Sequence, residues 1–376
     1  MSAGRPVPFE VVAADGSARA GVAQLPLGAV TTPCFMPVGT RGAVRTLDAG
    51  DLERLGAQVV LGNTYHLMLR PGADVVADLG GLRGFTGFGG RFLTDSGGFQ
   101  IFSLEPRVDE DGATFASTYD GSRHRLTPES AVHIQARLGA DVQMALDVCP
   151  GLPAPPEAIR AATERTHRWA GRARAAFLAG IDEGIVPAHQ VQFGICQGGI
   201  DPSLRAASAS TIVGEGFDGY AIGGLSVGEP RDEMVPALAA ATAQMPAERP
   251  RYLMGVGDPA GIVEGIAHGV DLFDCVLPTR LARHGTALTM SGRLNLRNAR
   301  YARDLDPIDP LRPCPLLGEV SRGYLRHLFT VRELTAMRLV TLHNLWWLGE
   351  LVADLRRAIT AGTFSAARHD VLEVWG

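Results

Sequence analysis

Residues 269–285, GVDLFDCVLPTRLARHG, combine residue types that can do chemistry at a spacing that brings them together. The segment begins as an apolar strand and carries a carboxylate, Asp274, near the end of that strand. Two arginines three residues apart, Arg280 and Arg283, follow a turn at Pro278. A carboxylate at the end of a strand, followed closely by two arginines, is typical of a functional site. The structural alternative is that Asp274 caps a helix and the arginines lie in a solvated loop.

Three other apolar segments also end in a polar side chain. Asp95 lies in DSGGFQ, Asp147 in LDVC and Gln197 in CQGG. In isolation Asp95 and Gln197 could be turn residues, and Asp147 could cap the turn into Pro150. Several polar side chains at the carboxyl ends of neighbouring strands are more typical of one shared site than of separate turn-forming residues.

The predicted strands 220–224 and 252–256 end in small or apolar residues. With the polar side chains above, these residues would complete a candidate pocket. They are Gly223, Gly224, Leu225 and Met254. Leu225 and Met254 could instead belong to the core.

The chemistry that these residues suggest is displacement at a sugar carbon. Two carboxylates can share such a displacement, one as nucleophile and the other as acid and base. Asp, Gln and backbone groups can read the hydrogen-bonding edge of a purine-like base. The backbone of Ser96, Gly97 and Gly98 can approach a flat ligand closely, and Phe99 or Met254 could stack on it.

The elements that must position these residues follow a regular alternation. Short apolar strands are each followed by a turn and a helical pattern, and three helices begin with an N-cap residue and a proline, at Thr127-Pro128, Asp201-Pro202 and Asp258-Pro259. Eight strands alternating with helices predict a (β/α)8 TIM barrel. A doubly wound sheet is the alternative, but the glycine-rich dinucleotide turn usual after its first strand is missing. The predicted strands are 33–38, 58–62, 91–94, 142–147, 192–196, 220–224, 252–256 and 270–275.

Three segments lie outside this alternation. Residues 9–25 alternate around Asp15-Gly16, which predicts an N-terminal hairpin. The polar stretch 103–125 predicts a hairpin or lid over the barrel mouth. Residues 286–345 are rich in Arg and Pro and then turn into an amphipathic helix, which predicts a subdomain inserted into a single catalytic domain, 1–376.

Composition excludes several classes of protein. The 376 residues are 46% hydrophobic and 20% charged, as in a globular chain. The five cysteines form no CxxC pair, which favours a reducing, cytoplasmic setting, and no run is apolar and long enough to cross a membrane. All 35 basic residues are arginine, so lysine-dependent chemistry is excluded. The net charge of −5 means that nucleic acid could bind only at a local patch.

Motifs along almost the whole chain resemble the tRNA-guanine transglycosylases, in their bacterial queuine or preQ1 type. The family fold is a TIM barrel with a small inserted subdomain, as the strand count also predicts. The matching stretches are MPVGT (36–40), GNTYHLMLRPG (62–72), LTDSGGFQIFSL (93–104), DGSRHRLTPE (120–129), FGICQGG (193–199), YAIGGLSVGEP (220–230), RYLMGVGDP (251–259), FDCVLPTR (273–280) and SRGYLRHLF (321–329).

The resemblance implies a role for each matching residue. Asp274 would displace guanine from the ribose of tRNA position 34, giving a covalent ribosyl-enzyme, and Asp95 would be the general acid/base. The base would be held by Ser96, Gly97, Gly98, Phe99, Asp147, Gln197, Gly223, Gly224, Leu225 and Met254. The RNA contacts would come from Gly255, Val256, Gly257, Asp258, Arg280, Leu281, Ala282 and Arg283.

The resemblance also implies the substrates and partners. The substrates would be a tRNA with a GUN anticodon and a free base, guanine or preQ1 (7-aminomethyl-7-deazaguanine), for queuosine biosynthesis. Cys149 and Val227 resemble the residues of the bacterial enzymes that use preQ1. A homodimer is implied, and no cofactor is required for the chemistry.

The chain departs from the family at the structural zinc site. The family places Cys, Cys, Cys and His where this chain has Arg312, Cys314, Leu317 and His343. Two ligands do not close a tetrahedral site, so the sequence predicts no structural zinc, with Asp309 as a weak substitute ligand at most. Apolar packing, including Leu311, is expected to replace the metal.

Smaller departures keep other functions open. Leu281 stands where a small polar residue is usual, and Val148 where an acidic residue is usual. The alternatives are a non-catalytic tRNA-binding paralogue and a transglycosylase acting on DNA or another RNA. Retention of all four key polar residues counts against the first of these.

Overall fold

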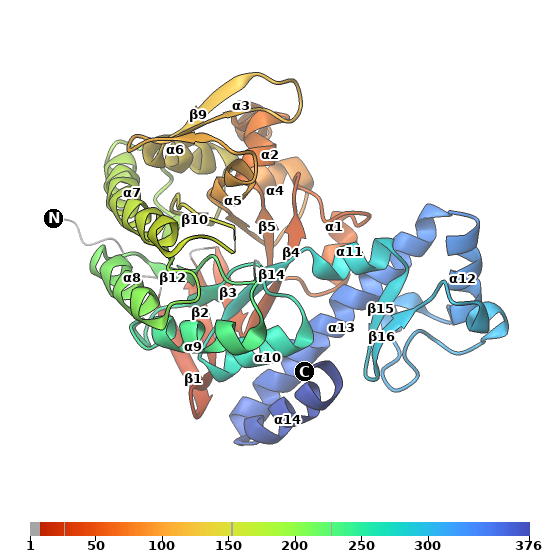
Figure 1. The fold of residues 1–376 in the computed structure, drawn as a ribbon. Helices are drawn as coiled ribbons and strands as arrows, with labels where there is room; N and C mark the ends of the chain where they lie inside the picture. Colours follow the sequence, from red (N-terminus) through yellow and green to blue (C-terminus); the bar gives the residue numbers. More distant parts are fainter. Residues whose placement is uncertain (1–7, 26, 152, 227) are drawn as a thin grey trace.

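The central element is a closed barrel of parallel strands (Figure 1). The computed structural model describes residues 8–25, 27–151, 153–226 and 228–376. Around the barrel the strands follow in the order β10 (Val142–Met144), β11 (Val191–Cys196), β12 (Gly219–Ile222), β13 (Arg251–Leu253), β14 (Leu272–Cys275), β4 (Cys34–Gly39), β5 (Val59–Gly62) and β6 (Arg91–Thr94). The predicted TIM barrel and its eight strands are therefore confirmed.

The barrel strands are apolar because both of their faces are covered. Alternate residues divide between two clusters: Met36 and Val38 pack in one that fills the barrel, and Phe35 packs in one shared with the outer helices. Asp274 follows Phe273, a residue of the outer cluster, so the two-residue period turns its carboxylate inward. The strand predicted over 142–147 is shorter in the structure: β10 ends at Met144, so Asp147 lies in the loop that follows, three residues beyond the strand.

Helices cover the outside of the barrel and its ends, except α12, which belongs to the C-terminal subdomain. They are α1 (Ala49–Arg54), α2 (Thr64–Leu69), α3 (Ala73–Asp78), α4 (Gly81–Thr86), α5 (Gly98–Phe102), α6 (Pro128–Leu138), α7 (Pro156–Asp182), α8 (Pro202–Gly214), α9 (Arg231–Thr242), α10 (Pro259–Ala267), α11 (Leu277–Arg283), α12 (Arg322–Thr330), α13 (Leu334–Ala361) and α14 (Phe364–Trp375).

The three predicted N-caps are confirmed. Thr127 accepts a hydrogen bond from the Ser130 backbone, Asp201 from the Ser203 and Leu204 backbones, and Asp258 from the Gly261 backbone. These caps satisfy amide groups at the first turn of α6, α8 and α10 and so fix where each loop at the barrel mouth ends. None of the described helices is long and apolar enough to span a bilayer.

The N-terminal segment closes the amino-terminal end of the barrel. The predicted hairpin forms as β1 (Phe9–Asp15) and β2 (Ala18–Leu25), and β3 (Gly28–Thr32) adds a third antiparallel strand. Phe9 and Val30 of this sheet join the cluster that fills the barrel. Arg19 on β2 donates to Asp271 at 2.9 and 2.5 Å, and both side chains are buried. This ion pair joins the sheet to the start of β14.

The segment predicted as a hairpin or lid forms a three-stranded antiparallel sheet, one strand more than a hairpin has. It consists of β7 (Arg107–Val108), β8 (Ala113–Ala116) and β9 (Arg123–Leu126), and it lies beside α2 and α6 in Figure 1. The Glu110 backbone accepts from the Trp169 indole of α7 at 2.9 Å, and the Glu110 carboxylate pairs with Arg168 at 2.8 Å. These contacts anchor the sheet to the barrel wall.

The C-terminal subdomain lies on the side of the barrel away from α7 and α8 (Figure 1). It contains the hairpin β15 (Thr286–Thr289) and β16 (Gly292–Asn295), the 3-10 turns η1 (Ala299–Arg303) and η2 (Pro315–Leu317), and α12. Its apolar residues form one cluster with residues of α11 and α13, including Leu325, Leu328 and Val340. Its arrangement therefore depends on the same helix that carries Arg280 and Arg283.

The buried ion pair between Arg19 and Asp271 gives a test of the barrel closure. Arg19→Met leaves a fully buried carboxylate without its cation, which should lower the free energy of unfolding by about 3–5 kcal/mol. The measurement is the urea midpoint followed by tryptophan fluorescence. Arg54→Met removes a half-exposed arginine from the ion pair with Asp51 and should cost less than about 1 kcal/mol. Equal effects of the two substitutions would contradict the role assigned to Arg19.

Candidate active site

A pocket of about 560 Å³ opens at the carboxyl ends of the barrel strands. Most of the side chains predicted to form a site line it, and they come from separate loops. These are Asp95, Ser96, Phe99, Asp147, Gly223, Gly224, Leu225, Met254 and Asp274. Carboxyl ends of parallel strands are where TIM-barrel sites form, so the structure brings the predicted residues together as expected.

Asp274 is held at the base of the pocket by neutral donors. Its Oδ1 accepts from the Tyr252 hydroxyl at 2.5 Å and from the Gly255 backbone at 2.8 Å. Oδ2 has no protein donor within the described part of the chain. Burial raises the pKa of this carboxyl, while the two hydrogen bonds oppose the rise. One oxygen is thus fixed and the other is free to attack a bound ligand.

The alternative role for Asp274 as a helix cap is wrong. The helix α11 begins after Val276, which is its N-cap residue and makes no side-chain capping bond. Asp274 instead belongs to β14. Because the capping alternative fails, the carboxylate is left with the pocket as its surroundings.

Asp95 follows β6 and is also buried. Its Oδ2 accepts from the Asn63 amide at 2.5 Å and its Oδ1 from the Thr64 backbone at 2.7 Å. Burial raises the pKa of Asp95 to about 6, and the nearby Asp274 carboxylate adds to the rise. A carboxyl with a pKa near neutrality can both take and return a proton, as a general acid/base must.

Asp147 and Ser96 form a second polar group in the pocket, and the buried Gln197 supports it from behind. The predicted residues Gly97, Gly98 and Gln197 are not part of the pocket lining. The Gln197 amide nitrogen donates to Asp147 Oδ2 at 2.6 Å, and the Ser96 hydroxyl donates to Oδ1 at 3.2 Å. Burial raises the pKa of Asp147. The Ser96 oxygen also accepts from the Gly98 backbone at 3.2 Å, which ties the DSGG turn to this group.

The glycines beside Gln197 are required by close contact. A Cβ atom at Gly224, whose φ is +66°, would lie 2.3 Å from the Gln197 Oε1 atom. A Cβ atom at Gly223 would lie 2.7 Å from the Gln197 Nε2 atom. Any other residue would displace the amide, so the glycines keep the wall flat and leave backbone groups at the pocket surface.

Arg205 supports this wall from behind, and the sequence analysis missed it. This fully buried side chain of α8 donates to the Gly223 carbonyl at 2.6 Å, the Gly224 carbonyl at 3.0 Å and the Gly199 carbonyl at 2.7 Å. It joins the loops after β11 and β12. Asn63 and Tyr252 were missed as well. Asn63 had one available signal, its place at the end of an apolar strand in GNTYH.

The predicted base walls and RNA contacts occupy different environments. Phe99 is 60% exposed at the mouth, whereas Leu225 is buried. Gly255, Asp258 and Arg280 line or border the pocket, and Gly257 lies against Cys275. The side chains of Val256 and Ala282 are buried. Leu281 and Arg283 are half-buried on α11.

The residues associated with choice of base are only partly placed. Cys149 lines the pocket, and burial raises the pKa of its thiol to about 12. Val227 lies outside the described residues. Val148 is buried, and its backbone donates to the Thr166 hydroxyl of α7 at 2.9 Å.

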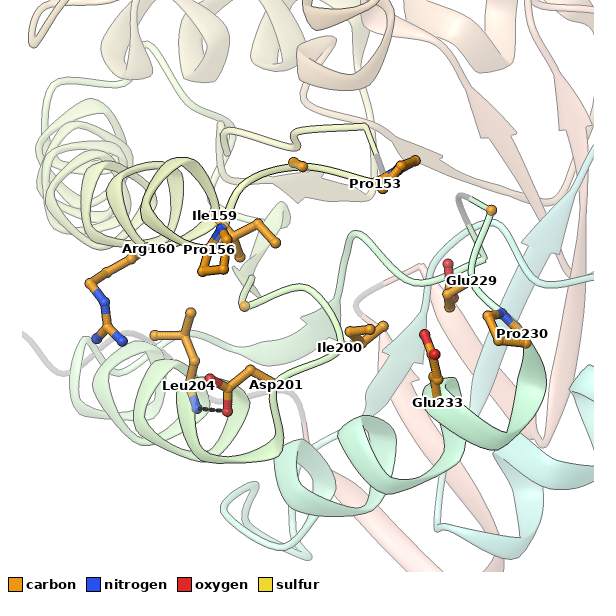
Figure 2. A pocket seen from close by; sticks show the side chains of 13 residues that line it. Pro153, Pro156, Ile159, Arg160, Ile200, Asp201, Leu204, Glu229, Pro230 and Glu233 are labelled. Atoms are coloured by element: carbon orange, nitrogen blue, oxygen red, sulfur yellow. Dashed lines mark hydrogen bonds between the residues drawn. The ribbon is translucent and has the colours of Figure 1, made fainter.

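A second pocket, of about 410 Å³, lies among the loops that lead into α7, α8 and α9 (Figure 2). Proline and aliphatic side chains, including Pro153, Ile159 and Ile200, make up much of its lining. Asp201 in this pocket is occupied as the cap of α8, and Glu229 accepts from the Ser226 backbone. Glu233 also lines this pocket, but it and Asp201 are exposed, so the second pocket lacks the buried carboxylates that mark the first one.

The residues at the family's zinc positions do not fit that metal. Arg312 pairs with Asp354 of α13, and Leu317 offers no ligand atom. The His343 Nε2 lies 2.7 Å from the Leu288 carbonyl and so donates to it, and burial lowers the pKa of the imidazole to about 4. Asp309 accepts from the Met290 and Leu311 backbones. The described residues contain no group of three potential metal-binding side chains.

The expected apolar replacement for the metal is only partly correct. Leu317 and Val320 pack against the subdomain cluster, but Leu311 is 74% exposed. Polar contacts of Arg312 and Asp309, rather than packing of Leu311, hold this loop in place without a metal. They join the loop before η2 to α13 and to the β15–β16 turn.

Comparison with known proteins gives one consistent result. The family model described as queuine tRNA-ribosyltransferase matches residues 15–376. A protein of that name from Novosphingobium aromaticivorans is 49% identical over 364 residues, which cover 96% of each chain. One from Herpetosiphon aurantiacus is 50% identical over 360 residues, covering 95% of this chain and 90% of the relative. One from Solidesulfovibrio magneticus is 50% identical over 372 residues, covering 97% of each.

The zinc positions lead to a prediction about metal removal. Protein purified without an affinity tag should contain well under one zinc per chain by mass spectrometry. Its thermal midpoint should be unchanged by EDTA, because Arg312 and Asp309 make their contacts without a metal. One zinc per chain together with a lower midpoint after chelation would contradict this account.

Proposed function

The chain belongs to the queuine tRNA-ribosyltransferase family, and from this premise we propose that it exchanges guanine at tRNA position 34 for preQ1 through a covalent ribosyl-aspartate. It is a pentosyltransferase with a TIM-barrel catalytic domain. The observation that carries the proposal is the Asp274 carboxylate. One of its oxygens is fixed by Tyr252 and Gly255, and the other faces the pocket that Asp95 and Asp147 share.

In the first step Asp274 Oδ2 attacks the anomeric carbon of the ribose. The bond to the base nitrogen breaks, and its electron pair leaves with guanine, which takes a proton from the protonated Asp95. The tyrosine hydroxyl and backbone amide on Oδ1 hold the attacking group without neutralising it with a cation. A desolvated carboxylate without a cation is the more nucleophilic one.

In the second step the incoming base loses its proton to Asp95 and attacks the same carbon. The bond to Asp274 breaks and its carboxylate is restored. Two displacements on one carbon retain its configuration. Asn63 and Thr64 hold Asp95 in place through both proton transfers.

The base would be held by the Asp147 and Gln197 group and by the backbone at Gly223 and Gly224. A carboxylate accepts two N–H donors from a guanine-like edge, and an amide offers both a donor and an acceptor. Phe99 is exposed at the mouth, where it can cover a bound ring. The position of Cys149 in the pocket supports preQ1 as the incoming base.

The proposal includes the partners of the enzyme. We infer that it acts on tRNAs with a GUN anticodon, in the cytoplasm and as a homodimer. The subdomain 286–345 would serve RNA binding and dimer formation, and its many arginines support that role. A non-catalytic paralogue and a transglycosylase for DNA or another RNA are the competing functions.

Incorporation of labelled guanine into tRNA tests the proposed function. The wild-type protein should label tRNAs with a GUN anticodon, and Asp274→Asn should abolish the labelling because an amide cannot form the intermediate. The fold should persist, since Asn can still accept from Tyr252 and Gly255. Asp201→Asn makes the same chemical change at the cap of α8, where Asn also caps well, and should leave labelling unchanged.

The outcomes separate the candidate functions. No labelling by a folded wild-type protein that binds tRNA would favour the non-catalytic paralogue. Labelling of DNA or another RNA in preference to tRNA would favour the third function. An active Asp274→Asn enzyme would refute the nucleophile assignment.

The raised pKa of Asp95 predicts the pH dependence of base exchange. Burial raises this pKa from 3.8 to about 6, so the carboxyl becomes protonated as the pH falls through about 6 and can no longer accept a proton. The rate constant kcat/KM for the incoming base should therefore fall on the acid side of about pH 6. Asn63→Ala removes a donor that stabilises the charged form, and should shift this limb to higher pH.

Asp95→Asn serves as the control for that assignment. It should remove the acid limb and lower kcat/KM by about 10²- to 10⁴-fold. If the acid limb of the kcat/KM profile stays at the same pH in Asn63→Ala, a carboxyl other than Asp95 controls the rate.

A further inference from the structure

A cluster of arginine and aromatic side chains lies beside the pocket mouth. Tyr119, in the turn between β8 and β9, has the Arg70 guanidinium 4.6 Å and the Arg41 guanidinium 5.3 Å from its ring centre. The Tyr119 hydroxyl lies 2.9 Å from His66 Nδ1, and His66 lines the pocket. The cluster thus joins three segments: the loop after β4, the helix α2 and the β8–β9 turn.

The two guanidinium groups of this cluster form no ion pair with a described carboxylate. Within the described residues neither Arg41 nor Arg70 has a carboxylate oxygen within 4 Å. Both side chains are exposed. The neighbouring Asp120 uses Oδ1 to accept from the Ser122 backbone and hydroxyl at 3.1 and 2.7 Å, and these bonds, with a smaller contribution from the Arg70 charge, lower the pKa of its carboxyl to about 2. Arg70 thus has this carboxylate nearby without an ion pair to it. Two cations on one ring repel each other, so the arrangement favours binding an anion between or beside them.

A second set of arginines, Arg45, Arg280 and Arg283, lies at the other end of the same rim. Arg280 and Arg283 lie one turn apart on α11, and Arg45 follows β4, the strand that pairs with β14. Burial and the charges of Arg45 and Arg280 lower the pKa of Arg283. None of these three forms an ion pair with a described carboxylate. The loop after β4 carries both Arg41 and Arg45, so it links the two sets.

The order of the barrel strands arranges these arginines in an arc. The strands β14, β4 and β5 are neighbours, and α11, the loop after β4 and α2 follow them in turn. The arc passes beside Asp274, which ends β14. A backbone that delivers one nucleotide into the pocket would place its flanking phosphates along this rim.

We propose that Arg41 and Arg70, held against Tyr119, form a binding site for a backbone phosphate of the RNA next to the nucleotide in the pocket. The proposal rests on the proposed function and extends it to residues outside the barrel loops that hold the base. The Tyr119 ring positions the two guanidinium groups, and its hydroxyl bond to His66 fixes the turn relative to the pocket. The β7–β9 sheet would then be an RNA-binding element.

Binding of a labelled anticodon stem–loop RNA, followed by fluorescence anisotropy at several salt concentrations, tests this site. Arg41→Ala and Arg70→Ala should each weaken binding by about three- to tenfold at physiological salt and lower the salt slope by about one. In base exchange both should raise the KM for RNA and leave kcat and the KM for free guanine unchanged. Tyr119→Ala should weaken binding by loss of the positioning ring.

Two control variants separate charge from other effects. Arg357→Ala removes one exposed positive charge from α13, next to Arg356, whose side chain donates to the Pro33 carbonyl just before β4. This variant lies at the amino-terminal end of the barrel strands and should change neither binding nor exchange. Arg41→Lys keeps the charge and should restore much of the affinity. An Arg41→Lys protein as defective as Arg41→Ala would overturn the phosphate site.

The results also distinguish this proposal from the function on which it rests. Wild-type exchange activity with unaltered RNA affinity in the Arg41→Ala, Arg70→Ala double variant would overturn the phosphate site and leave the function standing. A folded wild-type protein that exchanges no base in any tRNA would overturn the function itself.

Discussion

Desolvation of three carboxylates at one barrel mouth is the constraint on which the site depends. Asp95, Asp147 and Asp274 are all buried there, and burial raises the pKa of each. Each is held by neutral donors, such as the Asn63 amide, the Gln197 amide and the Tyr252 hydroxyl. A buried carboxylate paired with arginine would be a weak base and a weak nucleophile. Neutral donors orient the three groups and leave their reactivity intact.

Within the described residues no arginine forms an ion pair with these three carboxylates, although Arg280 lines the same pocket, and other arginines support the fold. Arg205 is buried behind the pocket wall and donates only to backbone carbonyls, where it fixes two glycine-containing loops. Arg19 pairs with Asp271 at the amino-terminal end of β14, the strand that carries Asp274 at its other end. These two arginines thus stabilise strands and loops, whereas the hydrogen bonds to the reactive carboxylates come from neutral donors.

Much of this architecture was predictable from the sequence. The eight barrel strands have a simple apolar pattern, and the N-caps at Thr127, Asp201 and Asp258 follow local rules of hydrogen bonding. Asp95, Asp147 and Asp274 were predicted because each lies at or beyond the end of an apolar strand, and the barrel topology alone brings such positions to one rim.

Contacts between distant segments were not predictable in the same way. Tyr252 has the pattern of a core residue in a strand, and only the barrel register brings its hydroxyl to Asp274. Arg205 lies in a helix where an exposed arginine is expected, and its carbonyl partners belong to loops formed elsewhere in the chain. Leu311 was expected to be buried, but its loop is held by polar contacts of Asp309 and Arg312, and the Leu311 side chain stays exposed. Such pairings depend on the complete fold.

The most direct test of the central claim is to trap the intermediate. Wild-type protein is mixed with an end-labelled anticodon stem–loop RNA, quenched in denaturant and separated by gel electrophoresis, and labelled protein is digested and analysed by mass spectrometry. The account predicts a covalent protein–RNA adduct on the peptide that contains Asp274. Base exchange by the same sample with no adduct, or with an adduct on another residue, would contradict it.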